Sequence, residues 1–100
     1  MRALGIQEAE REASGLDPHS FAVAKIAALV ALDAPPASYL WQVASAVAEG
    51  VTPEEILGVL RAVAPQVGLP RVVAAAPQVM LALGLTQRQE TAIPQQREEP

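Results

Sequence analysis

Two side chains in this sequence are suited to acid–base chemistry. Lys25 is the only lysine and interrupts the apolar segment Phe21–Leu32, whereas His19 is the only histidine and follows Asp17 and Pro18. If Lys25 faces a pocket, desolvation lowers its pKa, and it can then bind an anionic ligand or act as a base. Its stem can equally lie on apolar surface with the ammonium group in water. His19 falls in the first turn of a predicted helix, where a solvated surface histidine is the usual finding.

The composition excludes several classes of function. The chain has 100 residues and no cysteine, so disulfides, thiol redox chemistry and thiolate metal sites are excluded. One histidine and carboxylates scattered over predicted helix ends do not supply three or four convergent ligands, so no metal or other cofactor is expected. The formal net charge is −4 and the seven basic residues are scattered, so nucleic acid is not an expected partner.

The sequence also gives no sign of export or membrane insertion. Its N-terminal segment turns acidic within eight residues and lacks the apolar stretch that a signal peptide needs. The longest apolar run, Ile26–Leu32, falls far short of the roughly 20 residues needed to cross a bilayer. We therefore expect a cytoplasmic protein without a membrane partner.

The clearest structural signal is a pair of helices joined by a short turn. The first, about Ala37–Glu49, should end at Gly50, since glycine enters the left-handed region without a Cβ penalty. The second should begin with a capping box, in which Thr52 and Glu55 satisfy each other's backbone N–H groups and Pro53 takes the first helical position. The apolar spacing that follows is that of one helical face as far as Val67.

Three further helices complete an all-α fold of about five helices. A short, solvated helix over Ile6–Ser14 should stop at Gly15, and an apolar, central helix should run from Pro18 to Leu32. The last helix should span about Arg71–Leu83 and end at Gly84. Prolines are predicted to break or bend the helices at Pro35, Pro36, Pro65 and Pro77.

This pattern divides the chain into a helical domain, residues 1–84, and a polar, disordered tail, residues 85–100. The tail could also serve in targeting or as an adaptor. Hydrophobic residues make up 51% of the chain, a high fraction for one small domain. Apolar surface that a single copy cannot bury usually marks an interface. An obligate homo-oligomer is therefore expected.

The segment from Leu16 to Gly84 resembles the carboxymuconolactone decarboxylase family, which includes the alkylhydroperoxidase D-like proteins. The most specific pieces are AEGVTPEEI, residues 48–56, and LRAVAPQVGLP, residues 60–70. The resemblance implies an all-helical domain that assembles as a trimer or hexamer and contains a small-molecule pocket.

The residues that usually perform the chemistry of this family differ in this chain. The resemblance aligns the family's glutamate with Ala22, its histidine with Gln42 and its Cys-x-x-Cys pair with Pro35 and Ser38. Without thiols, peroxidase activity of that type is excluded. Decarboxylation needs no cysteine, but an amide side chain can neither give nor take a proton.

The resemblance places the ligand site near one turn of the third helix, which makes Ser38, Tyr39, Trp41 and Gln42 candidate ligand-binding residues. Lys25 is the fifth candidate, because it interrupts the apolar second helix. For Tyr39 and Trp41, simple core packing is an equally good interpretation. The leading hypothesis is a non-redox, non-catalytic oligomeric module that binds a small anion or has a structural role. The alternative is a decarboxylase or related lyase acting on a small anionic lactone or carbonyl compound, in which Lys25, Tyr39 or His19 replaces the missing groups.

Overall fold

A computed structural model describes the backbone of residues 2–98 and the side chains of residues 8–88. Every regular element in this part of the chain is a helix, which confirms the predicted all-α class. The elements, in order, are α1 (Arg2–Ser14), α2 (Pro18–Leu32), α3 (Pro36–Ala48), α4 (Pro53–Val67) and α5 (Leu69–Glu98).

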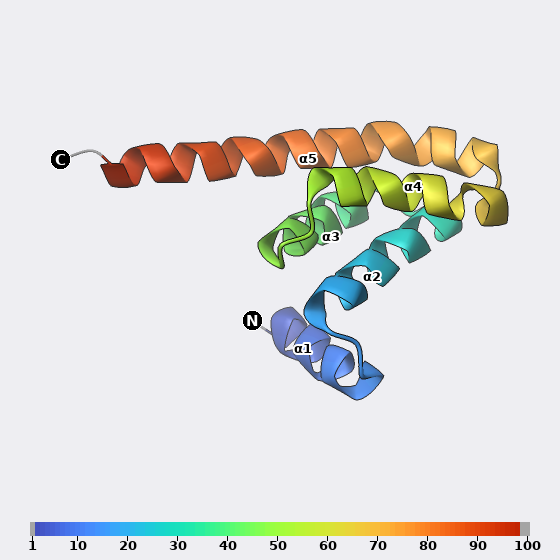
Figure 1. The fold of residues 1–100 in the computed structure, drawn as a ribbon, viewed down its shortest axis with the longest axis horizontal. Helices are drawn as coiled ribbons and strands as arrows, with labels where there is room; N and C mark the ends of the chain where they lie inside the picture. Colours follow the sequence, from blue (N-terminus) through green and yellow to red (C-terminus); the bar gives the residue numbers. More distant parts are fainter. Residues whose placement is uncertain (1, 99–100) are drawn as a thin grey trace.

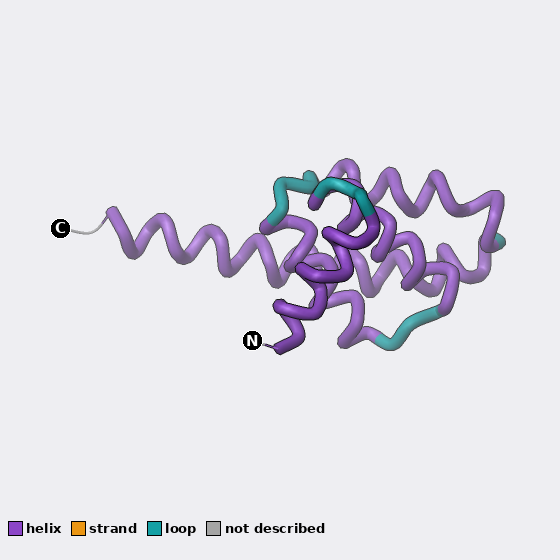
Figure 2. The backbone as a smooth tube through the Cα atoms, turned by 90° about the horizontal axis from the view of Figure 1, so that it is seen from below, coloured by secondary structure: helices purple, strands orange, loops and turns teal. Residues whose placement is uncertain are grey.

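Four of the helices pack around one core. Figure 1 shows α5 along one edge of the molecule with α3 and α4 against it, while α2 crosses beneath them and leads to α1 on the side away from α5. The view in Figure 2 shows the short loops that join these helices. Because α2 packs against α3, α4 and α5, the prediction that it is central is correct.

Only one side of α2 is covered, however. Its buried side chains are Ala22, Ile26 and Val30, spaced four residues apart on one face. Leu32 at the end of the helix is 75% exposed. The apolar residues on the far side of α2 therefore have no cover within the described part of a single chain.

The local signals for helix ends are confirmed. The Thr52 hydroxyl accepts a hydrogen bond from the Glu55 N–H at 3.1 Å, and the Glu55 carboxylate accepts one from the Thr52 N–H at 2.8 Å. Gly50 has a φ of 91°, so it is in the conformation that the predicted helix stop requires. The end of α2 comes before the prolines, at left-handed Asp33, where the Ala34 N–H donates to the Leu29 carbonyl at 3.1 Å.

The predicted stop at Gly84 is wrong. Helix α5 continues through Gly84 to Glu98, and its last part projects beyond the other helices in Figure 1. A single glycine costs a helix only about 1 kcal/mol, and the glutamine, glutamate and arginine residues that follow favour helix. Leu85 is half-buried and Thr86 is buried, so packing holds the helix together just past the glycine. Residues 85–98 are thus helical where a disordered tail was expected.

One segment of α5 is long and apolar enough to cross a membrane. This segment, Leu69–Arg88, was not recognised from the sequence because no single apolar run within it is long. The core helix of a soluble protein meets the same criterion, and part of this segment packs against α3 and α4. The property is therefore weak support for a membrane location.

Candidate functional site

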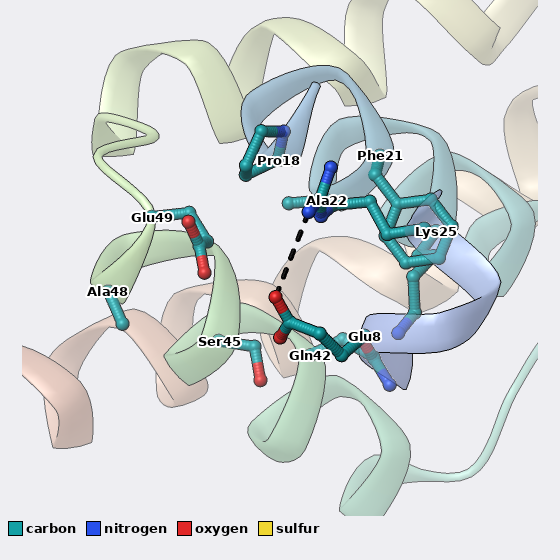
Figure 3. Close-up of a pocket in the computed structure, with 10 residues that line it drawn as sticks. Glu8, Pro18, Phe21, Ala22, Lys25, Gln42, Ser45, Ala48 and Glu49 are labelled. Carbon is teal, nitrogen blue, oxygen red and sulfur yellow. Dashed lines mark ion pairs between the residues drawn. The ribbon is translucent and has the colours of Figure 1, made fainter. Parts of the chain in front are cut away.

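A cavity of about 260 Å³ opens between α1, α2 and α3. Lys25 and Ala22 line it from α2, and Gln42 lines it from α3 (Figure 3). The cavity thus brings together Lys25 and the two positions, Ala22 and Gln42, that the resemblance aligns with a glutamate and a histidine. Ala22 and Gln42 are 20 positions apart in the chain, and the packing of α2 against α3 places them in one site.

Lys25 is half-buried at the edge of this cavity. Burial lowers the pKa of its ammonium group, because removal of water disfavours the charged form. Its Nζ atom lies 5.1 Å from the centroid of the Phe21 ring, within reach of a cation–π interaction. Lys25 is thus a half-buried cation in the lining of the cavity, close to an aromatic ring.

Helix α1 supplies two charged residues that the sequence analysis did not identify. Glu8 and Arg11 line the cavity, and the Arg11 Nη2 atom lies 3.7 Å from the Glu8 Oε2 atom, shown by the dashed line in Figure 3. Their i, i+3 spacing is visible in the sequence. That α1 places them beside Lys25 follows only from the turn between α1 and α2.

Ser45 of α3 and Glu49, the residue that caps its C-terminus, also line the cavity. With Gln42 they occupy positions i, i+3 and i+7, one polar stripe of a helix that is otherwise rich in alanine and valine. From this spacing, Ser45 and Glu49 could have been predicted to lie on the same side of the helix as Gln42. Together with Gln42, the Ser45 hydroxyl gives the cavity groups that can both donate and accept hydrogen bonds.

Tyr39 belongs to the core and does not line the cavity. It is 1% exposed, and its hydroxyl donates a hydrogen bond to the Leu29 carbonyl at 3.1 Å. Burial, reinforced by the negative charge of Asp33, raises the pKa of this phenol. Its neighbours on the buried face of α3 are Val43 and Ala46, so the core interpretation of Tyr39 applies.

The other candidates also lie outside the cavity. Trp41 is 53% exposed, and Ser38 is half-buried in the first turn of α3, where its N–H donates to the Pro35 carbonyl at 3.0 Å. The His19 Nε2 atom lies 3.1 Å from both carboxylate oxygens of Glu55, so His19 ties α2 to the start of α4. Of the five candidate residues, the structure places Lys25 and Gln42 together in this site.

The charges around the cavity do not form a metal centre. Within the described residues, no group of three or more histidine, cysteine, aspartate or glutamate side chains is arranged to hold a metal ion. The lining instead offers two cations, two carboxylates and two neutral polar groups. Such a set can bind a small polar molecule through charge and hydrogen bonds.

Comparison with known proteins identifies the family. The family model described as the carboxymuconolactone decarboxylase family matches residues 2–80, which include α1 and all but the last four residues of the segment that carries the resemblance. Searches of curated proteins and of solved structures returned no significant match. Since the family model covers well over half of the chain, this protein belongs to the carboxymuconolactone decarboxylase family.

Proposed function

We propose that this protein is a non-redox, non-catalytic member of its family that binds a small organic anion in the cavity between α1, α2 and α3. The observation that carries the proposal is the lining itself: Ala22 and Gln42, which the resemblance aligns with ionisable groups of the family, both line the cavity. Neither side chain can transfer a proton. The cavity therefore has charged and polar groups that can bind a ligand, but at these two positions it lacks the acid–base groups needed to transform one.

Two cations support the choice of an anionic ligand. Lys25 and Arg11 approach the cavity from different helices, and Gln42 and Ser45 can hydrogen-bond to a carbonyl or lactone oxygen. A partly buried ammonium group is stabilised when an anion binds beside it, which offsets the desolvation that lowers its pKa. Charge-assisted hydrogen bonds of this kind are about twice as strong as neutral ones.

The test compares a γ-lactone with and without a carboxylate. We expect 5-oxotetrahydrofuran-2-carboxylate and pyruvate to raise the Tm, and neutral γ-butyrolactone to leave it unchanged. A ligand at ten times its Kd stabilises the fold by roughly 1.4 kcal/mol. For a domain of this size, that raises the Tm by more than about 5 °C. Differential scanning fluorimetry and calorimetric titration measure the two effects.

The matched variants are Lys25→Met and Arg61→Met. Methionine keeps most of the apolar stem of Lys25 and removes its charge, so we expect at least a tenfold loss of affinity for the carboxylates. Arg61 is exposed on α4, outside the cavity, so its replacement should leave the affinity unchanged. An equal loss of affinity in both variants would point to non-specific attraction by net charge and would overturn the proposed site.

A second candidate function is favoured by the position of Lys25. A lysine whose pKa is lowered by burial and that faces a cavity can act as a base or anchor a substrate. The protein would then be a decarboxylase or related lyase acting on an anionic lactone or carbonyl compound. Robust turnover of a carboxylated lactone by the wild type, lost in Lys25→Met, would establish this function in place of the first.

We also propose that the protein works as a homo-oligomer, a trimer or hexamer. Among the side chains that the structure describes, nine large hydrophobic ones are exposed in the single chain, including Leu32, Leu69 and Val73. Exposed apolar surface on this scale usually marks an interface. The protein should therefore sediment well above its 10.5 kDa monomer mass. A monodisperse monomer at micromolar concentration would contradict the proposal.

A further inference from the structure

The charged residues that line the cavity fall into two groups. Glu8 and Arg11 both come from α1 and form one ion pair, with 3.7 Å between the Glu8 Oε2 and Arg11 Nη2 atoms. Arg11 is held further by its Nη1 atom, which donates a hydrogen bond to the Leu16 carbonyl at 3.3 Å. As a pair, these two residues add no net charge to the cavity. The distribution of charge across it therefore depends on the other two, Lys25 and Glu49.

Lys25 and Glu49 give the cavity a positive and a negative side. Figure 3 shows the two residues on opposite sides of the cavity. Lys25 comes from the middle of α2, and Glu49 comes directly after the last residue of α3. Among the side chains that the structure describes, no basic group forms an ion pair with the Glu49 carboxylate. A ligand with charges of both signs can thus find a partner for each of them in this cavity.

The position of Glu49 is unfavourable for α3 itself. The carbonyl groups at the C-terminus of a helix carry partial negative charge, so a cation is stabilising there and a carboxylate is not. Glu49 is the C-terminal cap of α3, and its N–H donates to the Ser45 and Ala46 carbonyls at 3.1 and 3.0 Å. A positively charged group bound in the cavity beside Glu49 would stabilise both the carboxylate and the end of the helix.

We propose that the ligand is a small zwitterion of the amino-acid type, whose carboxylate binds at Lys25 and whose ammonium group binds at Glu49. This inference rests on the proposed function, which supplies the carboxylate and its place in the cavity. It makes Glu49 a ligand-binding residue that determines specificity. A carboxylate without an ammonium group would meet the same cation, but it would gain no partner at Glu49 and would be repelled by the negative charge there.

The test compares amino acids with carboxylates of the same length that lack the ammonium group. The pairs are 3-aminopropanoate with propanoate, 4-aminobutyrate with butyrate, and 6-aminohexanoate with hexanoate, so that the distance between the two charges varies. We expect at least one amino acid to bind at least tenfold more tightly than its matched carboxylate in calorimetric titrations at neutral pH.

The same titrations separate the zwitterion from the proposed function. If the simple carboxylates or 5-oxotetrahydrofuran-2-carboxylate bind, and no amino acid binds more tightly than its matched carboxylate, the zwitterion is overturned and the proposed function stands. If none of these compounds binds, both proposals are overturned.

Glu49→Gln tests the assignment of the ammonium group, because it removes the charge and keeps the size of the side chain. It should abolish the preference for the amino acid and leave the affinity for the matched carboxylate unchanged or higher. Glu54→Gln is the matched control, since Glu54 is exposed on α4, outside the cavity, and its replacement changes the net charge equally. The preference should persist in Glu54→Gln. A preference that survives in Glu49→Gln and is lost in Glu8→Gln would place the ammonium group at α1 and overturn the role of Glu49.

The free protein provides a check that needs no ligand. Because a carboxylate at the end of α3 is unfavourable, Glu49→Gln should keep or raise the Tm measured by differential scanning fluorimetry. Glu54 lies in the first turn of α4, where a negative charge is stabilising, so Glu54→Gln should lower the Tm. A lower Tm in Glu49→Gln would mean that Glu49 stabilises the fold, and it would overturn the argument that this carboxylate is placed for a ligand.

Discussion

Tyr39→Ala should destabilise the protein by about 3–5 kcal/mol, a large part of the total stability of a small domain. The ring of Tyr39 is fully buried between α3 and the rest of the core, and its removal leaves a cavity that neighbouring side chains can fill only in part. Urea denaturation followed by circular dichroism measures the loss. Incomplete folding at 25 °C would be the extreme form of the same result.

The variant Tyr39→Phe measures the contribution of the hydroxyl group alone, because it keeps the ring. It removes the hydrogen bond to the Leu29 carbonyl, which still accepts one from the Ala34 N–H, so the expected cost is about 1 kcal/mol. The affinity for carboxylate ligands should not change, since Tyr39 does not line the cavity. If Tyr39→Phe kept its stability and lost ligand binding, Tyr39 would be a ligand group, and its assignment to the core would be wrong.

Replacing the two residues that the resemblance aligns with a glutamate and a histidine should give the protein decarboxylase activity. We expect Ala22→Glu combined with Gln42→His to convert carboxymuconolactone slowly with loss of CO2, measured by the disappearance of the substrate in NMR spectra. Both positions face the same cavity, so the two new groups would lie near one bound ligand. Positioned acid–base groups contribute about 10²–10⁴-fold to the rate of a proton-transfer step.

The control variant introduces the same imidazole group at a position outside the cavity. Ser38→His puts an imidazole on the same helix but outside the cavity, so combined with Ala22→Glu it should give no activity. Equal activity in the two double variants would show that position 42 is not part of a site. A double variant that binds the lactone carboxylate yet shows no turnover would mean that these two groups alone do not restore the family's reaction.

The sequence by itself determined the features of this protein that depend on neighbouring residues. The capping box of Thr52 and Glu55, the turn at Gly50 and the start of α2 at Pro18 are each fixed by contacts within a few positions of the chain. Helical spacing of apolar residues is equally local, so the number and order of the helices could be predicted. The absence of cysteine excludes thiol chemistry whatever the fold, because no arrangement of the chain can supply a missing side chain.

Only the tertiary structure decided which side chains share a site. Tyr39 and Gln42 are three residues apart on α3, yet the packing of α2 turns one into the core and the other toward the cavity. Glu8 and Arg11 join the site because of the angle between α1 and α2. These outcomes depend on contacts between segments far apart in the chain, which local propensity and spacing do not encode.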